Sequence, residues 1–141
     1  MRILHTLGSA LAIVFISSVA FAQPTIATVR IGHTVLLNGK SVPPGTYQVR
    51  LTDEFATPAV GESPRAEQWV EFLQAGKVVA RELASVIGAQ QLSANTGRPK
   101  GTAGTMNTNR ARVEDLKGGD YTRVSITRNG ERYVINAPLV R

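Results

Sequence analysis

A pattern near the C-terminus restricts the fold of this chain more than any other feature of its sequence. Two β-rich runs, residues 121–128 and 131–139, are separated only by the dipeptide Asn129-Gly130. Asn-Gly is preferred in the two-residue type I′ turn, because both central residues of that turn need a positive φ. The pattern predicts an antiparallel β-hairpin.

The register of this hairpin follows from its turn. Ile126 falls opposite Tyr133 and Val124 falls opposite Ile135, so four apolar side chains share one face. The other face carries polar side chains: Ser125, Thr127 and Arg132. We therefore expect one face of the hairpin in a core and the other in water.

A second strand pattern lies nearer the N-terminus. Residues 46–51 alternate strictly, with three apolar side chains on one face: Tyr47, Val49 and Leu51. Pro44 and Gly45 fit the two central positions of a type II turn before this run. The alternation predicts a strand with one buried face.

The segment before this strand is also β-rich. Residues 27–37 have the composition of a strand, and Asn38-Gly39 marks a tight turn before residues 40–42. We expect two or three strands in this half of the chain.

The middle of the chain allows two interpretations. Residues 66–89 contain good helix formers, and their apolar spacing also suits a helix. The dipeptide Ala75-Gly76 interrupts that spacing, and β-branched and aromatic residues flank it. We prefer a hairpin of residues 68–74 and 77–87, with the helix as the alternative.

Together these segments predict an all-β protein: an antiparallel β-sandwich or sandwich-like barrel of about seven or eight strands. Seven side chains are expected in its core: Val49, Leu51, Phe72, Val124, Ile126, Tyr133 and Ile135. Residues 53–64 carry two prolines and are expected to form a loop. A long flexible loop is expected around residues 88–112, rich in Gly, Ser, Thr and Asn.

The N-terminus has the three parts of a cleavable secretory signal. Arg2 supplies the positive start, an apolar run follows, and the small residue Ala22 precedes a cleavage position at Gln23. The apolar run is shorter than the roughly 20 residues that span a bilayer, although a retained anchor is the alternative. The sequence predicts a signal peptide at 1–22, a mature chain without a transmembrane span, and a periplasmic or secreted location.

The remaining residues, 23–141, suffice for a single domain. The chain has no cysteine, so its stability is expected to come from a packed core rather than from disulfides. His33 is the only histidine after the signal, and we expect it to be structural. No nucleophile motif, cofactor motif or set of metal ligands is recognised, so no cofactor and no metal are expected, and we do not expect an enzyme.

Paired carboxylates leave one enzymatic alternative open. Glycoside hydrolysis needs only two carboxyl groups several ångströms apart, and the chain offers Asp53 and Glu54 on one side. Their partners in a cleft would be Glu114, Asp115 or Asp120. The alternative function is thus a carbohydrate-active enzyme that uses two carboxylates.

The charge distribution points to a binding function instead. The chain has 16 Lys and Arg against 10 Asp and Glu. No acidic residue lies between Glu82 and Glu114, where four basic residues are the candidate ligand-binding set: Arg98, Lys100, Arg110 and Arg112. We expect an anionic polymer of the cell envelope, or another envelope protein, as the partner.

Nucleic acid is not expected as the partner. The basic region has no interleaved aromatic residues on which bases could stack. A further alternative is an accessory subunit that pairs through a sheet edge, with residues 77–87 as the candidate edge.

The stretches Ala27-Thr-Val-Arg and Val35-Leu-Leu-Asn-Gly-Lys40-Ser-Val-Pro-Pro-Gly45-Thr-Tyr-Gln-Val-Arg50 resemble small exported bacterial β-sandwich proteins with a Pro-x-Gly-x-Tyr-x-Val element. That element is also similar to one in immunoglobulin-like and carboxypeptidase-regulatory-like modules. The resemblance covers about 25 residues, and it implies a β-sandwich in which the Pro-Gly pair turns the chain and the tyrosine packs inward. It implies no catalytic residue.

Overall fold

The computed structural model describes residues 23–89, 91–92 and 109–141, so the predicted signal at 1–22 lies outside the described residues. Apart from a short helical stretch at residues 89, 91 and 92, the regular elements of these residues are strands, which confirms the predicted all-β class. Nine strands follow one another along them: β1 (Thr25–Ile31), β2 (Val35–Leu37), β3 (Lys40–Val42), β4 (Gly45–Phe55), β5 (Glu67–Gln74), β6 (Lys77–Ile87), β7 (Arg110–Asp115), β8 (Tyr121–Arg128) and β9 (Glu131–Pro138).

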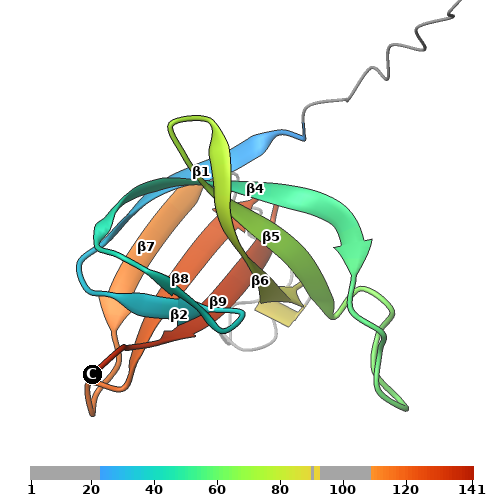
Figure 1. Ribbon diagram of the computed structural model, residues 1–141. Coiled ribbons are helices and arrows are strands. Elements are labelled where there is room, and N and C mark those ends of the chain that lie inside the picture. Colours follow the sequence, from blue (N-terminus) through green and yellow to red (C-terminus); the bar gives the residue numbers. More distant parts are fainter. Residues whose placement is uncertain (1–22, 90, 93–108) are drawn as a thin grey trace, which may run out of the picture.

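Seven of the strands form one antiparallel sheet in the order β1-β4-β5-β6-β9-β8-β7. The sheet curls until its two edge strands, β1 and β7, pack beside each other (Figure 1). Because every neighbouring pair is antiparallel, β1 and β7 run in the same direction, and no ladder joins them in the described part of the chain. The result is a nearly closed, sandwich-like barrel, as predicted.

The C-terminal hairpin has the predicted register. Val124 pairs with Ile135 and Ile126 pairs with Tyr133. Asn129 and Gly130 both have a positive φ, at 51° and 80°, as a type I′ turn requires.

Residues 66–89 form the preferred hairpin, and the alternative of a helix is wrong. β5 and β6 pair along their length, from Glu67 with Ser85 to Gln74 with Lys77. Ala75 and Gly76 both have a positive φ at the turn. The helical spacing of the apolar residues is overridden because both strands pack in the middle of the sheet.

Two local predictions need correction. Residues 27–37 do not form one strand, because β1 ends at Ile31 and β2 begins at Val35. Gly45 has no positive φ and begins β4, so the type II turn at Pro44 and Gly45 is not formed. A Cβ at Gly45 would crowd two side chains, at 3.2 Å from Nε2 of Gln74 and 3.3 Å from the hydroxyl of Tyr47, and the glycine leaves them room.

The boundaries of both predicted loops differ from those expected. β4 continues to Phe55, so it takes the first residues of the loop predicted at 53–64. β7 begins at Arg110, so the predicted loop around 88–112 loses its last residues to a strand. Pairing with β8 supplies the hydrogen bonds that make residues 110–112 a strand despite their polar composition.

The predicted core is confirmed, with six of its members fully buried and Leu51 half-buried against them. Phe72 and Val49 pair across β4 and β5 at its centre. Tyr47 packs inward and donates a hydrogen bond of 2.6 Å to the Pro43 carbonyl, so its polar end is satisfied.

The sheet splits between β6 and β9, and the small β2–β3 hairpin fills the split. The ladder from β6 to β9 covers only residues 85–87. β2 attaches to the end of the chain through a bridge between Val35 and Leu139 and a 2.9 Å bond from the Val140 amide to the Thr34 carbonyl. The apolar side chains of the hairpin are buried and complete the core: Val35, Leu37 and Val42.

This topology also corrects the predicted edge strand. β6 lies between β5 and β9 in the sheet, and the edges are β1 and β7. Residues 77–84 of β6 nevertheless have no ladder on the side of β9, because the two strands diverge there.

Candidate functional site

The strands β7, β8 and β9 lie side by side and have one face toward the core and one toward the outside (Figure 1). Val124 and Ile126 of β8 are buried, so the alternation of a strand turns the residues between and beside them outward. The ladders then place four arginines on the outer face: Arg110, Arg112, Arg123 and Arg132. We call these four residues the arginine face.

The geometry of the sheet sets the spacing of these arginines. Arg110 and Arg112 are two residues apart on β7, which separates their backbones by about 7 Å. Arg110 and Arg132 flank Thr127 from the two neighbouring strands, so their backbones lie about 10 Å apart. The charges are therefore distributed over a sheet surface rather than gathered in one point.

Positive charge on the arginine face exceeds negative charge. Glu114 is the only acidic side chain on the outer side of β7, β8 and β9, and it pairs with Arg112 at 3.1 Å. Arg123 donates a 3.0 Å hydrogen bond to the neutral side chain of Asn136, and its cross-strand partner on β7 is the same Glu114. Within the described residues Arg110 and Arg132 have no acidic partner.

Two of the four arginines of this face were predicted from the sequence. Arg110 and Arg112 belonged to the candidate set, whereas Arg98 and Lys100 lie outside the described residues. Arg123 and Arg132 were missed, because they are close to acidic residues in the sequence and do not raise its local charge. The predicted register of the C-terminal hairpin could have identified Arg132, since it already placed this residue on the outer face.

Guanidinium groups arranged in this way suit oxyanions. Each is planar, stays charged at all physiological pH values, and can form two parallel hydrogen bonds with a carboxylate, phosphate or sulfate. The arginine face can therefore bind several anionic groups at once without a cofactor or metal.

On the inner side of the same strands, Tyr133 is buried and donates a 2.8 Å hydrogen bond to the Glu131 carboxylate. Burial, reinforced by this carboxylate, raises the pKa of Tyr133 to about 12. The phenol thus remains neutral under physiological conditions, and Tyr133 acts as a packed residue of the core.

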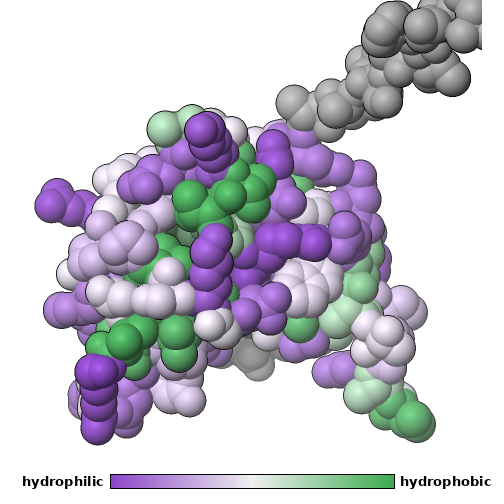
Figure 2. All heavy atoms as spheres, in the orientation of Figure 1, coloured by the Kyte–Doolittle hydropathy of each residue, from purple (hydrophilic) through white to green (hydrophobic). Residues whose placement is uncertain are grey.

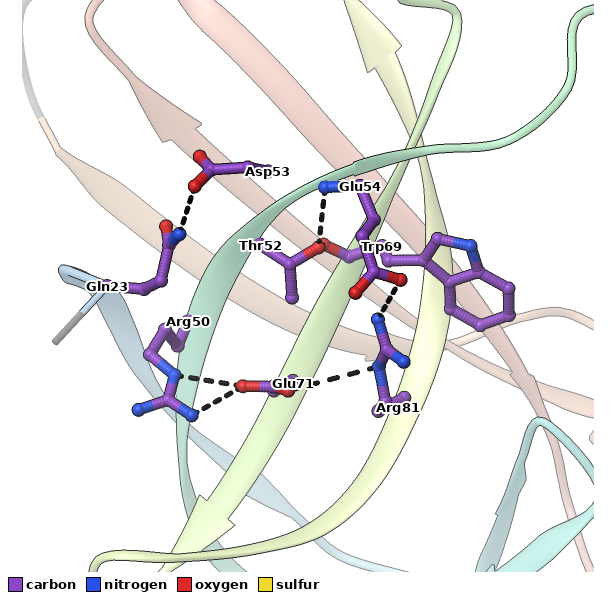
Figure 3. A network of polar contacts seen from close by, with 8 residues as sticks. All are labelled: Gln23, Arg50, Thr52, Asp53, Glu54, Trp69, Glu71 and Arg81. Carbon is purple, nitrogen blue, oxygen red and sulfur yellow. Dashed lines mark hydrogen bonds and ion pairs between the residues drawn. The ribbon is translucent and has the colours of Figure 1, made fainter. Parts of the chain in front are cut away.

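A second polar group lies on the outer side of β4, β5 and β6 (Figure 3). Glu71 accepts hydrogen bonds of 2.9 and 2.5 Å from Arg50, and it lies 3.9 Å from Arg81. Arg81 also bonds Glu54 at 2.6 Å and places its guanidinium 5.2 Å from the centre of the Trp69 ring. Two positive and two negative charges cancel here, so this group holds three strands together rather than attracting ions.

The carboxylates of the enzymatic alternative do not meet. Asp53 accepts a hydrogen bond from the side chain of Gln23, which precedes β1. Asp115 lies 3.3 Å from His33, which follows β1. Seven residues of strand separate these positions by about 20 Å. That distance exceeds the roughly 5–10 Å that the two carboxyl groups of a glycosidase require.

The remaining carboxylates also have partners of their own. Glu54 pairs with Arg81, and Asp120 pairs with Arg141. Asp115 accepts a 2.7 Å bond from the Thr122 hydroxyl in addition to its contact with His33. His33 thus lies against the end of β7.

Among the residues that the structure describes, no three His, Cys, Asp or Glu side chains gather into a group that could hold a metal ion. The same residues contain no helix that is long and apolar enough to cross a membrane. No protein-family model, no curated protein and no solved structure matches the chain.

Proposed function

We propose that this chain is an exported, non-enzymatic binding module of the cell envelope, and that its arginine face binds an anionic polymer. The observation that carries the proposal is the placement of Arg110, Arg112, Arg123 and Arg132 on one outer sheet face with a single acidic neighbour. The N-terminal sequence, which has the parts of a secretory signal, supports the proposed periplasmic or secreted location.

The arrangement of the charges favours a polymer over a small ligand. A small anion is held best in an enclosed pocket with convergent donors, whereas these guanidinium groups start about 7 to 10 Å apart on a sheet. A chain with repeated phosphate or carboxylate groups can reach several of them together. Each contact is weak in water, but their sum gives affinity through effective concentration.

Such binding should depend on salt. Exposed charges are screened over about 10 Å at 0.1 M salt and over about 3 Å at 1 M salt. The proposed interaction should therefore be measurable at low ionic strength and be lost near 0.5 M NaCl.

The test compares two fourfold variants that remove the same charge. One replaces Arg110, Arg112, Arg123 and Arg132 with serine. The other replaces four basic residues elsewhere on the surface with serine: Lys40, Arg65, Lys77 and Lys117. Retention on immobilised lipopolysaccharide and on an acidic polysaccharide is measured at 50 and 500 mM NaCl.

We expect the arginine-face variant to lose retention at 50 mM NaCl and the control variant to keep most of it. Equal loss in both variants would show a response to net charge alone and would contradict the proposal. Retention of the wild-type chain only on an acidic envelope protein, and on neither polymer, would contradict the polymer as partner.

A further inference from the structure

An exposed aromatic side chain lies at one end of the arginine face. Tyr121 begins β8 and is 45% exposed. It lies on the same outer side of the strand as Arg123, which follows two residues later. Pro138 lies opposite Tyr121 on β9, and the Leu116 amide bonds its carbonyl at 2.9 Å from the side of β7. The face therefore combines positive charge with an apolar surface at its end.

The groups next to Tyr121 can bond hydroxyls. Glu114, Arg123 and Asn136 lie opposite one another across β7, β8 and β9. Nε of Arg123 donates to the side-chain oxygen of Asn136, so the terminal nitrogens of the guanidinium and the amide NH₂ of Asn136 remain as donors. The carboxylate of Glu114, which pairs with Arg112 at 3.1 Å, can accept a further hydrogen bond.

The outer side of β8 forms a line of different chemical groups. It presents one aromatic ring, one guanidinium and two hydroxyls in sequence: Tyr121, Arg123, Ser125 and Thr127. The six residues from the first to the last of these span about 20 Å. Thr127 lies between Arg110 and Arg132 on the two neighbouring strands. An extended chain lying along β8 would thus meet the ring at one end and the arginines along its length.

We propose that the anionic polymer of the arginine face is an acidic polysaccharide, and that one of its sugar rings stacks on Tyr121. This inference rests on the function proposed above. A sugar ring has an apolar face of C–H groups, which packs on an aromatic ring, and an edge of hydroxyls, which bonds amides and guanidinium groups. A polyphosphate supplies negative charge but no apolar ring face, so it would leave Tyr121 unused.

Single-stranded nucleic acid fits this face less well. Its recognition by stacking uses aromatic side chains for successive bases. Within β7, β8 and β9, Tyr121 is the one aromatic residue on the outer side, because Tyr133 is buried. One ring next to hydroxyl-bonding groups is better suited to a sugar.

The experiment measures dissociation constants for polygalacturonate and for inorganic polyphosphate at 50 mM NaCl. Tyr121→Ala keeps the charge of the chain and should weaken binding of polygalacturonate at least about fivefold, because the stacking surface is lost. Its affinity for polyphosphate should stay within about twofold of the wild-type value, and Tyr121→Phe, which keeps the ring, should bind both polymers within about twofold as well. Equal weakening of both polymers by Tyr121→Ala would overturn the proposal.

The matched control is Val78→Ala. Val78 is also 45% exposed, but it lies on β6, where Figure 2 shows an apolar patch beside hydrophilic side chains. Its replacement should leave the affinity for both polymers unchanged. If Val78→Ala weakens polygalacturonate as much as Tyr121→Ala does, the sugar is not bound at Tyr121 and the proposal is wrong.

The fourfold serine variant of the arginine face separates this inference from the function on which it rests. We expect that variant to lose both polymers. If it keeps both, the proposed function itself fails. If it loses both while Tyr121→Ala binds polygalacturonate like the wild-type chain, the arginine face binds a polymer but the stacking on Tyr121 is wrong.

Two further measurements address the identity of the polymer. Titration with a short oligogalacturonate should shift the NMR signals of the Asn136 side-chain amide and of the Tyr121 ring. Unchanged signals at both groups under saturating oligogalacturonate would overturn the proposal. Tighter binding of single-stranded oligothymidylate than of polygalacturonate would do the same, because it would identify the face as a nucleic-acid site.

Discussion

The carboxylate of Glu82 accepts the backbone amide of Asn38, which lies 44 residues earlier in the chain. Glu82 pairs with the buried Val70 across β5 and β6, so it starts from the core-facing side of its strand. Its carboxylate reaches the open side of β6 and bonds the tip of the β2–β3 hairpin as well as the Leu83 amide. One acidic side chain thus attaches the hairpin to the strand that the sheet leaves unpaired.

Replacing Glu82 with alanine should loosen the hairpin without unfolding the barrel. Two backbone amides lose their acceptor, and because both are near solvent we expect the free energy of unfolding to fall by about 1–2 kcal/mol. Hydrogen exchange at Asn38 should accelerate, which can be followed by NMR. Glu62→Ala is the control, since the Glu62 carboxylate accepts the amide of the nearby Ala59 within a loop. An equal effect of both changes would contradict the role of Glu82.

Arg81 should be the most important residue of the polar group in Figure 3. Arg81→Met keeps the aliphatic stem but removes the ion pair with Glu54 and the contact with Trp69. Because Arg81 is partly exposed, we expect a loss of only about 1 kcal/mol in the free energy of unfolding. The fluorescence of Trp69, the single tryptophan, should change as well.

The matched control is Arg65→Met. Arg65 lies 5.3 Å from the centre of the Phe55 ring and has no ion pair within the described residues. The Arg65→Met substitution should lower the free energy of unfolding by less than about 0.5 kcal/mol. It should leave the tryptophan emission unchanged. A larger destabilisation from Arg65→Met than from Arg81→Met would contradict the assigned role.

Alkaline pH should destabilise the protein through Tyr133. Its pKa is raised from 10.0 to about 12 by burial and by Glu131, so folding favours the neutral phenol. The stabilisation is fully present below pH 10 and is lost as the pH rises from 10 toward 12, by on the order of 2 kcal/mol.

Tyr133→Phe keeps the ring and removes the titrating group. Chemical denaturation at pH 8, 10 and 11.5 should show a steeper loss of stability for the wild-type chain than for this variant. Parallel pH profiles for the two proteins would show that Tyr133 does not titrate as expected. Tyr47, whose pKa is also raised by burial, remains in both proteins and cancels in the comparison.

Phe72 should be among the most costly core positions to truncate. It is fully buried beside Val49 at the centre of the sheet, so Phe72→Ala should lower the free energy of unfolding by about 3–5 kcal/mol. Val60→Ala, at a fully exposed position, should change the free energy of unfolding by no more than about 0.5 kcal/mol. Urea denaturation of both variants checks this; a Phe72→Ala loss below about 1 kcal/mol would mean that the core is not packed as described.

Local patterns in the sequence were enough to predict the hairpins. Asn129-Gly130 specifies its turn because Asn and Gly are among the few residues that tolerate a positive φ, whereas Ala75-Gly76 marked its turn by interrupting the helical spacing. The alternation beside each turn then determined which side chains face the core, including Phe72 and Ile135. These predictions depend only on neighbours in the chain, which is why they were confirmed.

Only the tertiary structure decided how the hairpins combine. The split between β6 and β9 and the position of the β2–β3 hairpin depend on curvature of the whole sheet, which no local pattern encodes. The arginine face likewise joins Arg110 to Arg132 through pairing of β7 with β8 after a long connection. Such nonlocal pairings are decided by burial of the assembled core, so the sequence by itself determined the parts and the packing determined where the charges meet.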